Sequence, residues 1–372
     1  MATIPAEAEV QNEFPCIQCG ASLVFAPGTT SLVCQHCGTE NCILLGQDVE
    51  PVSDSDYLAA LDELAHGDEF DETLTVKCSR CGAETTLPTN VTAKECAFCG
   101  VAIVAKQASR KLIRPGFLLP FHISREHAYE KFRAWIASRW FAPSSLRDAA
   151  QTCQLSGIYM PAWTYRCDTN SRYTGMRGDD YWVTQTYRSN GKTHTRMVRH
   201  TRWRHASGRV DNAFRDLLVR ASNSLPESYF HCLEPWDLKQ LTAFRNEYLA
   251  GFISESYQID VKAGFEHAKE DMAAAIKKTV CRDIGGDHQR IHQVSTNYSN
   301  IGYKHILLPL WLSAYRYHDK SYRFMVNART GKIRGERPYS FWKIFAAIAV
   351  AIVITAIIAL IANAHFGGAR FH

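Results

Sequence analysis

Four Cys-x-x-Cys pairs within the first 100 residues constrain this chain more than any other feature. Eight of its thirteen cysteines lie in these pairs, and each pair is followed directly by glycine. Fourteen residues separate the inner cysteines of each set of two pairs, and all four positions recur at an offset of 62. Recurrence at a fixed offset indicates a duplicated module. The pairs are Cys16 with Cys19, Cys34 with Cys37, Cys78 with Cys81, and Cys96 with Cys99.

This spacing is typical of four thiolates around one tetrahedral metal ion. Each turn delivers two sulfurs to one point, and its glycine tolerates the positive φ at which the chain folds back. We therefore predict two structural zinc ions, one for each module, with no open ligand position for catalysis. Iron also suits an all-sulfur tetrahedron, so zinc against iron stays open. Equal gaps favour two independent ribbons over cross-bracing between modules, and a cytoplasmic location disfavours disulfides.

Charge divides the chain into an acidic head and a basic body. Residues 1–110 hold 5 Lys and Arg against 16 Asp and Glu, whereas the remaining residues hold 37 against 21. Phosphate binding needs Lys and Arg on the contact face, so we do not expect the ribbons to bind nucleic acid. Between the ribbons, the acidic stretch Ser53–Asp56 precedes an amphipathic segment and predicts a capped helix. We expect this helix to pack on a ribbon or to dock a partner.

The segment Ile344–Ala362 is the transmembrane signal of the sequence. Its 19 residues carry no charge. A helix of that length spans about 28 Å, close to the thickness of a bilayer core. Basic residues cluster before the segment, whereas only Arg370 follows it. The positive-inside rule therefore predicts a single-pass protein whose N-terminal domains face the cytoplasm. The first 13 residues carry no positive charge and no apolar run, so no signal peptide is expected.

The rest of the chain predicts an α+β body with antiparallel sheets that arose by a second duplication. Residues 111–255 and 256–338 each show an apolar strand, a helix and a strand with the pattern Pro-x-Trp. We expect the first helix to be capped by Ser124 and to run through Trp140. The second is capped by Asp260 and runs to about Cys281. The expected strands are Leu119–Ile123, Ile158–Trp163, Tyr257–Ile259 and Leu307–Trp311.

A basic insertion at residues 164–210 interrupts the first module. It alternates over Thr193–Arg204, reading THTRMVRHTRWR, and both faces carry arginine. A basic hairpin with aromatic residues among its arginines suits RNA, DNA, lipid headgroups or an acidic partner. The simpler interpretation is a solvated sheet whose arginines pair with neighbouring carboxylates. Those carboxylates are Asp179, Asp180, Asp211 and Asp216.

The sequence shows no familiar catalytic motif. A Walker A loop, a Gly-x-Ser-x-Gly nucleophile elbow and a His-Glu-x-x-His metal helix are all missing. Asp283–Asp287, which reads DIGGD, predicts a Gly-Gly turn after a long helix in preference to a cation site. His288 and His292 are four residues apart but have no carboxylate partner in the pattern. We therefore predict that the protein is not an enzyme.

Six segments of the body, together with the ribbons, resemble a family of bacterial membrane-anchored double zinc-ribbon proteins of the TFIIB type. The segments are Phe121 with Trp140–Pro143, Gly157–Pro161, Tyr173–Gly178, Leu233–Leu238, Asp283–Asp287 and Val326–Gly331. Members often carry names such as primosomal protein N′-like or superfamily II helicase-like, but the missing ATP-binding loop does not support a helicase. The resemblance covers nearly the whole chain and implies a membrane docking platform in membrane-stress systems. It implies partners of the SPFH (band 7/flotillin-like) or phage-shock-protein-A-like type, and supports only the eight cysteines as ligands.

These observations combine into one expected organisation. We predict a non-enzymatic adaptor or scaffold that docks cytoplasmic protein partners at the bacterial inner membrane. The alternative is a nucleic-acid-binding accessory protein that acts through Arg199–Arg209. The expected segments are zinc ribbon 1 at 1–50, an acidic helical linker at 51–74, zinc ribbon 2 at 75–110, module 1 at 111–255, module 2 at 256–338, the transmembrane helix at 339–363 and a short tail at 364–372.

Overall fold

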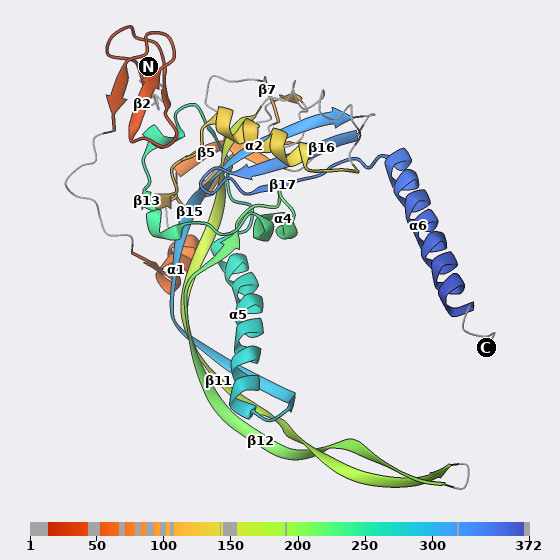
Figure 1. Ribbon diagram of the computed structural model, residues 1–372. Coiled ribbons are helices and arrows are strands. Elements are labelled where there is room, and N and C mark those ends of the chain that lie inside the picture. The colour runs from red at the N-terminus through yellow and green to blue at the C-terminus, as the bar shows by residue number, and fades with distance from the viewer. Residues whose placement is uncertain are drawn as a thin grey trace.

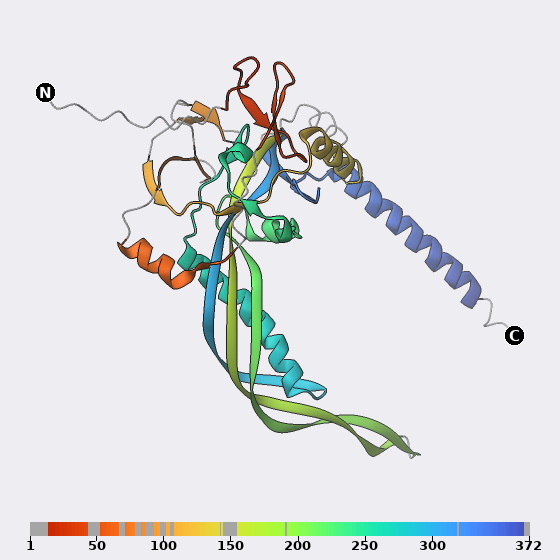
Figure 2. The same cartoon turned by 90° about the vertical axis from the view of Figure 1, so that its left-hand side faces the viewer.

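The structure of the chain is a computed structural model. A small N-terminal sheet, a long curved ribbon of strands and a separate C-terminal helix project from a central sheet (Figure 1). The small N-terminal sheet lies at the end of the body opposite the curved ribbon, as Figure 2 also shows. The residues that the structure describes are 14–43, 53–66, 71–78, 83–86, 93–96, 102–104, 108–141, 143, 155–189, 192–317 and 320–367.

The first cysteine module is a three-stranded antiparallel sheet that is attached to the body. Its strands are β1 (Leu23–Phe25), β2 (Ser31–Cys34) and β3 (Glu40–Cys42), in that order. The N–H of Phe25 donates to the carbonyl of Ala250 at 3.0 Å, and that of Gly28 donates to Phe121 at 2.9 Å. The ring of Phe25 also meets the ring of Tyr248 edge-on, with centroids 5.1 Å apart. This module therefore shares a hydrophobic core with the body.

The second cysteine module repeats the strand pairing of the first at the same offset of 62. Its described strands are β5 (Asp71–Lys77), β6 (Glu84–Thr86), β7 (Ala93–Glu95), β8 (Ala102–Val104) and β9 (Ala108–Leu112). In the first module Ser31 lies opposite Cys42, and in the second Ala93 lies opposite Val104. Both residues of the second pair are shifted by 62 from the first, so the duplication in sequence is also a duplication in register.

One sheet organises the body. Its central order is β12-β11-β15-β10-β13, with β14 beside β11, β4 and β16 beside β15, and β17 beside β16. Pairing is antiparallel except where β10 meets β15 and where β14 meets β11. The strands are β4 (Ser55–Asp56), β10 (Phe117–Leu118), β11 (Ser156–Ser189), β12 (Lys192–Arg220), β13 (Thr242–Ala243), β14 (Ile253–Ser254), β15 (His288–Tyr317), β16 (Lys320–Asn327) and β17 (Ile333–Gly335).

The described helices are α1 (Tyr57–His66), α2 (Arg125–Ala137), α4 (Glu227–Cys232), α5 (Val261–Ile284) and α6 (Phe341–Gly367), with 3-10 turns η1 (Leu238–Gln240) and η2 (Asn246–Leu249). Side-chain caps start α2 and α5. The hydroxyl of Ser124 accepts the N–H of His127 at 3.2 Å, and the carboxylate of Asp260 accepts that of Ala263 at 2.7 Å. Both predicted N-caps are therefore confirmed, although α2 ends three residues before Trp140.

Alternation along the central strands places apolar side chains on both faces of the sheet. Tyr159 and Leu307 belong to a buried cluster with α2 and the first cysteine module. Their neighbours Ile158 and Leu308 belong to another cluster, with α4 and the second cysteine module. The two modules thus cover different parts of the body core.

β11 and β12 continue beyond the body as a long arm (Figures 1 and 2). β15 accompanies them as far as Gly178, which lies opposite His288. α5 packs along these three strands and buries one apolar stripe, including Phe265 and Met272. Beyond Gly178 the two strands run alone. We call residues 179–189 and 192–202 the arm tip.

The arm leaves the body at two adjacent β-bulges. The register of β11 shifts against both neighbours near Arg166. Asp216 on β12 and Asn300 on β15 lie within these shifts, with positive φ of 51° and 52°. Bulges bend a strand and increase its twist, so the pair accounts for the curvature at the base of the arm.

Some expected elements are placed differently by the structure. Tyr257–Ile259 is not a strand, because the N–H groups of Gln258 and Ile259 donate to the carbonyl of Ala221. In Leu119–Ile123, pairing ends at the preceding β10, and Pro120 supplies no N–H to continue it. β11 pairs directly with β15, so strands from both expected modules form one sheet. The duplication of the body stays a prediction.

The linker helix α1 packs on the body at the base of the arm. The carboxylate of Asp56 caps it by accepting the N–H of Leu58 at 2.8 Å. The ring of Tyr57 lies 4.9 Å from the ring of Phe265 on α5. Just before the helix, β4 pairs with β15. The expected capped helix is therefore confirmed, and its described contacts are with the base of the arm. Its packing on a ribbon or docking of a partner stays a prediction.

Candidate metal centre and docking arm

Four thiols converge in the first cysteine module. The sulfurs of Cys16, Cys19, Cys34 and Cys37 all lie within 4.8 Å of one another. Cys16 and Cys37 are 3.6 Å apart, and Cys19 and Cys34 are 3.5 Å apart. Zn–S bonds of about 2.3 Å give tetrahedron edges of about 3.8 Å, whereas disulfide sulfurs lie about 2.05 Å apart. The set therefore fits one tetrahedral ion, and neither disulfides nor cross-bracing describe this module.

Two similar turns hold these sulfurs. The N–H of Gly20 donates to the carbonyl of Cys16 at 2.8 Å, and that of Gly38 to Cys34 at 2.9 Å. Both glycines have positive φ, at 73° and 75°, as the glycine in each motif predicts. The N–H of Gln18 points at the sulfur of Cys16, 3.4 Å away. Cys16 and Cys34 are only 3% and 1% exposed, so one side of the site faces the core.

The neighbours of the exposed thiols favour unequal ionisation. Hydrogen bonds from the side chain and backbone of Thr39 lower the pKa of Cys37 to about 6. At Cys19 the N–H of Ala21 lowers the pKa, but the thiols of Cys34 and Cys37 outweigh it and raise the pKa to about 12. Four adjacent thiols cannot all ionise readily without a cation. A bound divalent metal would supply that positive charge.

The second module reproduces the first turn around Cys78. Its N–H donates to the carbonyl of Ala83 at 2.8 Å, which is the hydrogen bond that closes the equivalent turn 62 residues earlier. Cys78 and Cys96 are both buried in the body core. The other two expected ligands, Cys81 and Cys99, lie outside the described residues. The second metal site stays a prediction, which the matching strand register supports.

The remaining metal candidates are engaged within the fold. Over the described ranges, no second group of three or more ligating side chains converges. Asp283 accepts the hydroxyl of Tyr173 at 2.6 Å, and Asp287 accepts the N–H of Asp180 at 2.8 Å. His288 lies 3.1 Å from the carboxylate of Asp180. The DIGGD segment therefore contains the predicted Gly-Gly turn after α5, and its two carboxylates accept hydrogen bonds from the arm. Within the described residues, His292 belongs to no cluster of metal-ligating side chains.

One face of the arm tip carries aromatic pairs across the two strands. The rings of Tyr181 and His200 lie 5.8 Å apart, and those of Tyr187 and His194 lie 5.5 Å apart. The guanidinium of Arg196 sits over the ring of Tyr187 at 5.5 Å. These contacts orient the side chains but leave much of each side chain exposed. Within the described residues, no further helix or strand packs on the tip.

The other face of the tip presents larger apolar groups. Trp182 and Met197 are 60% and 65% exposed. A two-stranded ribbon without a packed face is marginally stable in water. Clustered exposed aromatic and apolar groups mark interaction sites. The tip contains two carboxylates and five basic residues, so its net charge is +3. The basic residues are Arg188, Lys192, Arg196, Arg199 and Arg202.

Carboxylates neutralise some arginines near His288, where β15 begins. Asp179 lies 2.9 Å from both Arg177 and Arg204, and hydrogen bonding from Arg177 lowers its pKa. Asp180 lies 3.5 Å from Arg199. The solvated-sheet interpretation is therefore correct for these two carboxylates.

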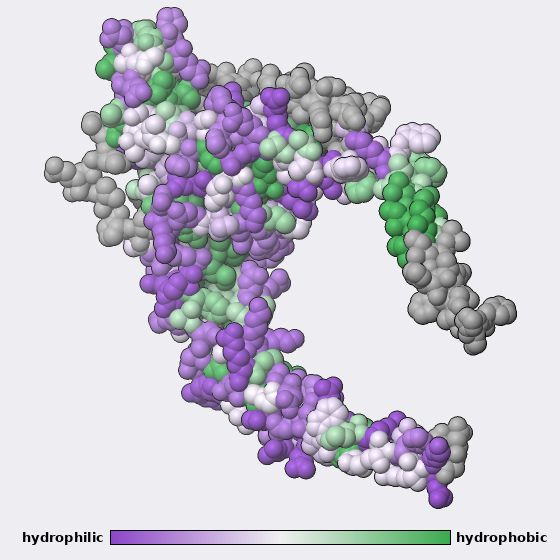
Figure 3. All heavy atoms as spheres, in the orientation of Figure 1, coloured by the Kyte–Doolittle hydropathy of each residue, from purple (hydrophilic) through white to green (hydrophobic). Residues whose placement is uncertain are grey.

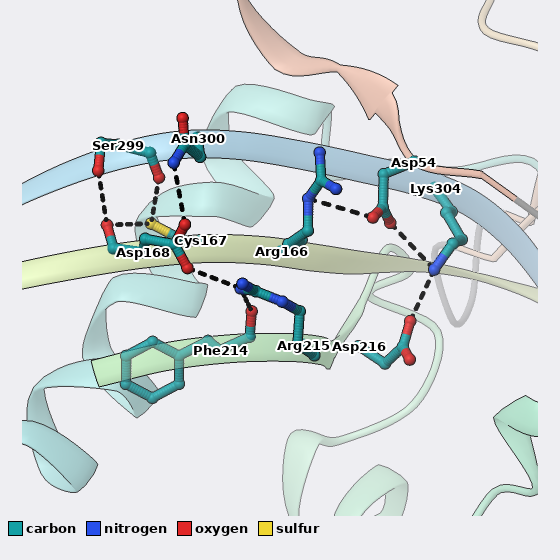
Figure 4. A network of polar contacts seen from close by, with 10 residues as sticks. All are labelled: Asp54, Arg166, Cys167, Asp168, Phe214, Arg215, Asp216, Ser299, Asn300 and Lys304. Carbon is teal, nitrogen blue, oxygen red and sulfur yellow. Dashed lines mark hydrogen bonds and ion pairs between the residues drawn. The ribbon is translucent and has the colours of Figure 1, made fainter. Parts of the chain in front are cut away.

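The two other predicted carboxylates have different partners, and one belongs to a network at the arm base (Figure 4). Asp211 accepts the side-chain amide of Asn170. Lys304, only 8% exposed in its side chain, lies 2.6 Å from Asp216 and 3.0 Å from Asp54 of the linker. Burial lowers the pKa of Lys304, but the two carboxylates outweigh burial and raise it. A lysine inside the apolar run of β15 was the sequence signal that motif analysis missed.

α6 begins beside the end of α2 and then extends away from the body. Within its span Phe341–Ala359 the mean hydropathy is 2.5 and none of the window is buried, as Figure 3 illustrates for the apolar side chains near the helix start. Leaving a large aliphatic side chain in water forgoes about 1.5–3 kcal/mol. A core helix would be covered, so length, composition and exposure together fit a helix that crosses a membrane.

The fold and site define a class: a four-cysteine module fixed to an α+β body with antiparallel sheets, followed by one apolar helix. No protein-family model matches the chain, and no solved structure matches it. The chain is 26% identical over 343 residues to the uncharacterized protein YdjG of Bacillus subtilis (strain 168). The matched region covers 90% of this chain and 92% of that protein. The similarity therefore extends over most of both chains.

Proposed function

We propose that the protein is a non-enzymatic, membrane-anchored adaptor that docks cytoplasmic protein partners at the bacterial inner membrane. The observation that carries the proposal is the arm tip. It combines exposed Trp182 and Met197 with a net charge of +3, at the end of a stem that α5 stiffens. Such a surface complements an acidic partner with apolar patches, because both charge and desolvation contribute to recognition.

α6 supplies the anchor in this proposal. Basic residues before and at the start of the helix support a cytoplasmic body through the positive-inside rule. They are Arg329, Lys332, Arg334 and Arg337 before α6, and Lys343 in its first turn. Each Lys or Arg costs about 2.5–3.5 kcal/mol at the centre of a bilayer. The arm tip therefore stays in water, where a cytoplasmic protein can reach it.

Zinc has a structural role in this proposal. Cys16, Cys19, Cys34 and Cys37 would hold one ion, and the equivalent four cysteines of the second module would hold another. An ion that is bound by four thiolates has no free ligand position for a substrate. Its role is to cross-link the segments that carry the cysteines. Since Cys16 and Cys34 lie in the core shared with α2, the metal would fix the first module against the body.

Partners of the SPFH or phage-shock-protein-A-like type follow from the resemblance described above. Nucleic acid is the second candidate, favoured by the stacked rings of Tyr181 and His200 beside arginine. Asp179 and Asp180 place negative charge among those arginines, however, and so oppose phosphate binding.

The test is purification of the full-length protein from native membranes in mild detergent, with and without changes at the tip. Trp182→Ser combined with Met197→Ser removes the two largest exposed groups of one face. Thr184→Ser with Thr195→Ser is the control, because both positions lie in the same ribbon. We expect a stoichiometric protein partner with the wild type and the control, and its loss with the first variant.

Two results would contradict the proposal. One is nucleic acid that survives moderate salt without any protein partner, which would support the accessory-protein alternative. The other is a partner retained at full stoichiometry by the Trp182→Ser, Met197→Ser protein, which would place docking elsewhere.

A further inference from the structure

One edge of β11 has no neighbouring strand beyond Gly178 in the described part of the chain. The N–H of Asp287, directly before β15, donates to the carbonyl of Gly178 at 2.9 Å. The carboxylate of Asp287 accepts the N–H of Asp180 at 2.8 Å. The backbone groups of Gly178 and Asp180 therefore face the side that β15 occupies nearer the body, and past Asp180 this edge is open.

The open edge continues through the arm tip with a regular pattern. Successive residues of a strand direct their N–H and C=O groups to alternate sides. Pairing of β11 with β12 runs without a register shift from Cys167 to Ser189, so the alternation is kept. Every residue from Tyr181 to Arg188 is exposed. An edge of this kind is a template for a further strand. The residues whose backbone groups face the open side are Trp182, Thr184, Thr186 and Arg188.

The charges along this edge complement a second copy of the same strand. Asp179 and Asp180 lie at one end of the edge, and Arg188 lies at the other. Two copies that pair antiparallel about a two-fold axis bring each arginine toward the acidic end of its neighbour. Gln185 lies halfway between Trp182 and Arg188, so an axis beside it would use the whole open edge of both copies.

The outer edge of β12 is also unpaired within the described residues, but its charges oppose self-pairing. In the arm tip β12 carries four basic residues and no carboxylate, so two copies of this edge would repel each other. The basic residues are Lys192, Arg196, Arg199 and Arg202. Pairing through β11 keeps both β12 strands on the outside of the assembly.

We propose that two copies of the chain pair through this edge of β11 and form a four-stranded sheet in the order β12-β11-β11-β12. Trp182 lies opposite Arg188 of the second copy, and Thr184 lies opposite Thr186 of the second copy. Each of these pairs exchanges backbone hydrogen bonds, and the arginine can also rest on the indole ring. A two-stranded ribbon is marginally stable in water, whereas three or more strands support one another.

This inference goes beyond the proposed docking of a cytoplasmic protein and does not depend on it. Pairing at an edge leaves both faces of the sheet uncovered, including the face that carries Met197. The arm tip can therefore pair with a second copy and still present its apolar groups.

Disulfide cross-linking of the full-length protein in native membranes tests the inference. In the proposed register position 185 lies opposite itself as a non-hydrogen-bonded pair, with Cα atoms about 4.5 Å apart, which suits a disulfide. Under mild oxidation we expect Gln185→Cys to give a linked species of twice the chain mass, in excess of any that the wild type forms. Val183→Cys is the matched control. It is exposed on the same face of the same strand, but its own copy would lie about 13 Å further along.

Proline variants test whether the open edge forms the contact. Thr184→Pro, added to Gln185→Cys, removes one N–H from the open side and should lower cross-linking about fivefold, as for one lost hydrogen bond. Thr195→Pro is the control, because Thr195 pairs with Thr186 and directs its N–H away from β11. It should leave cross-linking unchanged. Equal cross-linking of Gln185→Cys and Val183→Cys would overturn the inference, as would an equal effect of the two prolines.

Discussion

At the scale of single residues, His305 shows how a buried polar group joins distant segments. Its ring is 6% exposed and lies 4.6 Å from the ring of Trp163. Its Nδ1 lies 2.9 Å from the carbonyl of Ile113, which comes just before β10. Burial lowers the pKa of His305 to about 4. The folded protein therefore keeps this imidazole neutral.

This burial predicts a pH dependence of stability. The folded pKa of about 4 lies below the ordinary value of 6.5, so the unfolded chain takes up the proton first as pH falls. The contribution is fully present above about pH 6.5 and is lost toward pH 4, by up to about 3 kcal/mol. Thermal unfolding across this range measures it. His305→Gln should flatten the dependence, whereas exposed His292→Gln should not, and equal slopes for both would contradict the assignment.

The thiol cluster gives a second prediction at this scale. Cys16→Ser removes one buried ligand, and we expect the purified protein to lose one metal ion per chain, as measured by elemental analysis. Cys42→Ser is the control, since Cys42 lies on β3 of the same module but outside the cluster. Unchanged metal content in the Cys16→Ser protein would show that these four thiols do not form the site.

Residues with a local signature were predictable, and residues defined by long-range contacts were not. Cysteine spacing predicted the four-thiol cluster, and Ser124 and Asp260 were identified as caps because capping depends on neighbours within three residues. The apolar run around Lys304 indicated a buried lysine but not its partners, and His305 gave no local signal. Their roles depend on Asp54 and Ile113, which lie far away in the sequence.

At the scale of elements, the bulges at the base of the arm depend on residues that tolerate positive φ. Asn300 has φ of 52°, and its side chain donates to Asp168 at 2.9 Å. Asn300→Val should lower stability by about 2–3 kcal/mol, through backbone strain and the lost hydrogen bond. Asn300→Gly should lose less, because glycine accepts this φ. Thermal unfolding of both variants checks the order, and equal or reversed losses would contradict it.

α6 carries the anchoring prediction. A chain truncated after Arg337 should move from the membrane fraction to the soluble fraction when cells are broken and centrifuged. A version in which Leu and Ala of the same length replace α6 should remain in the membrane, because anchoring requires apolar length and not a particular sequence. Tight membrane retention of the truncated protein would show that another part of the chain also anchors it.

Element types were easier to predict than their extent. Alternation over Thr193–Arg204 indicated a strand, and it lies in β12. Alternation does not say how far pairing continues, so the 34 residues of β11 were not foreseen. Tyr257–Ile259 has the apolar character of a strand. Its backbone conformation is set instead by the hydrogen bonds to the carbonyl of Ala221 and by the cap of the first turn of α5 that follows it.

At the scale of the whole molecule, the cysteine modules are part of the body and not a detached head. Phe25 and Gly28 bond to the body, and Cys78 and Cys96 lie in its core. The α+β class with antiparallel pairing was predictable from strand and helix patterns. The joining of both expected modules into one sheet was not, because pairing between β11 and β15 spans more than 100 residues. This arrangement leaves the arm tip exposed beyond β15, on the side of α6 that the proposed function assigns to the cytoplasm.

The central claim is that the arm tip docks a cytoplasmic protein while α6 holds the chain in the membrane. The most direct measurement is site-specific photo-crosslinking in cells, with the photoreactive residue placed at Met197 and, for comparison, at exposed Arg133 on α2. The account predicts a discrete cross-linked protein from position 197 in the membrane fraction and none from position 133. Cross-links from position 197 only to nucleic acid, or to no macromolecule at all, would contradict it.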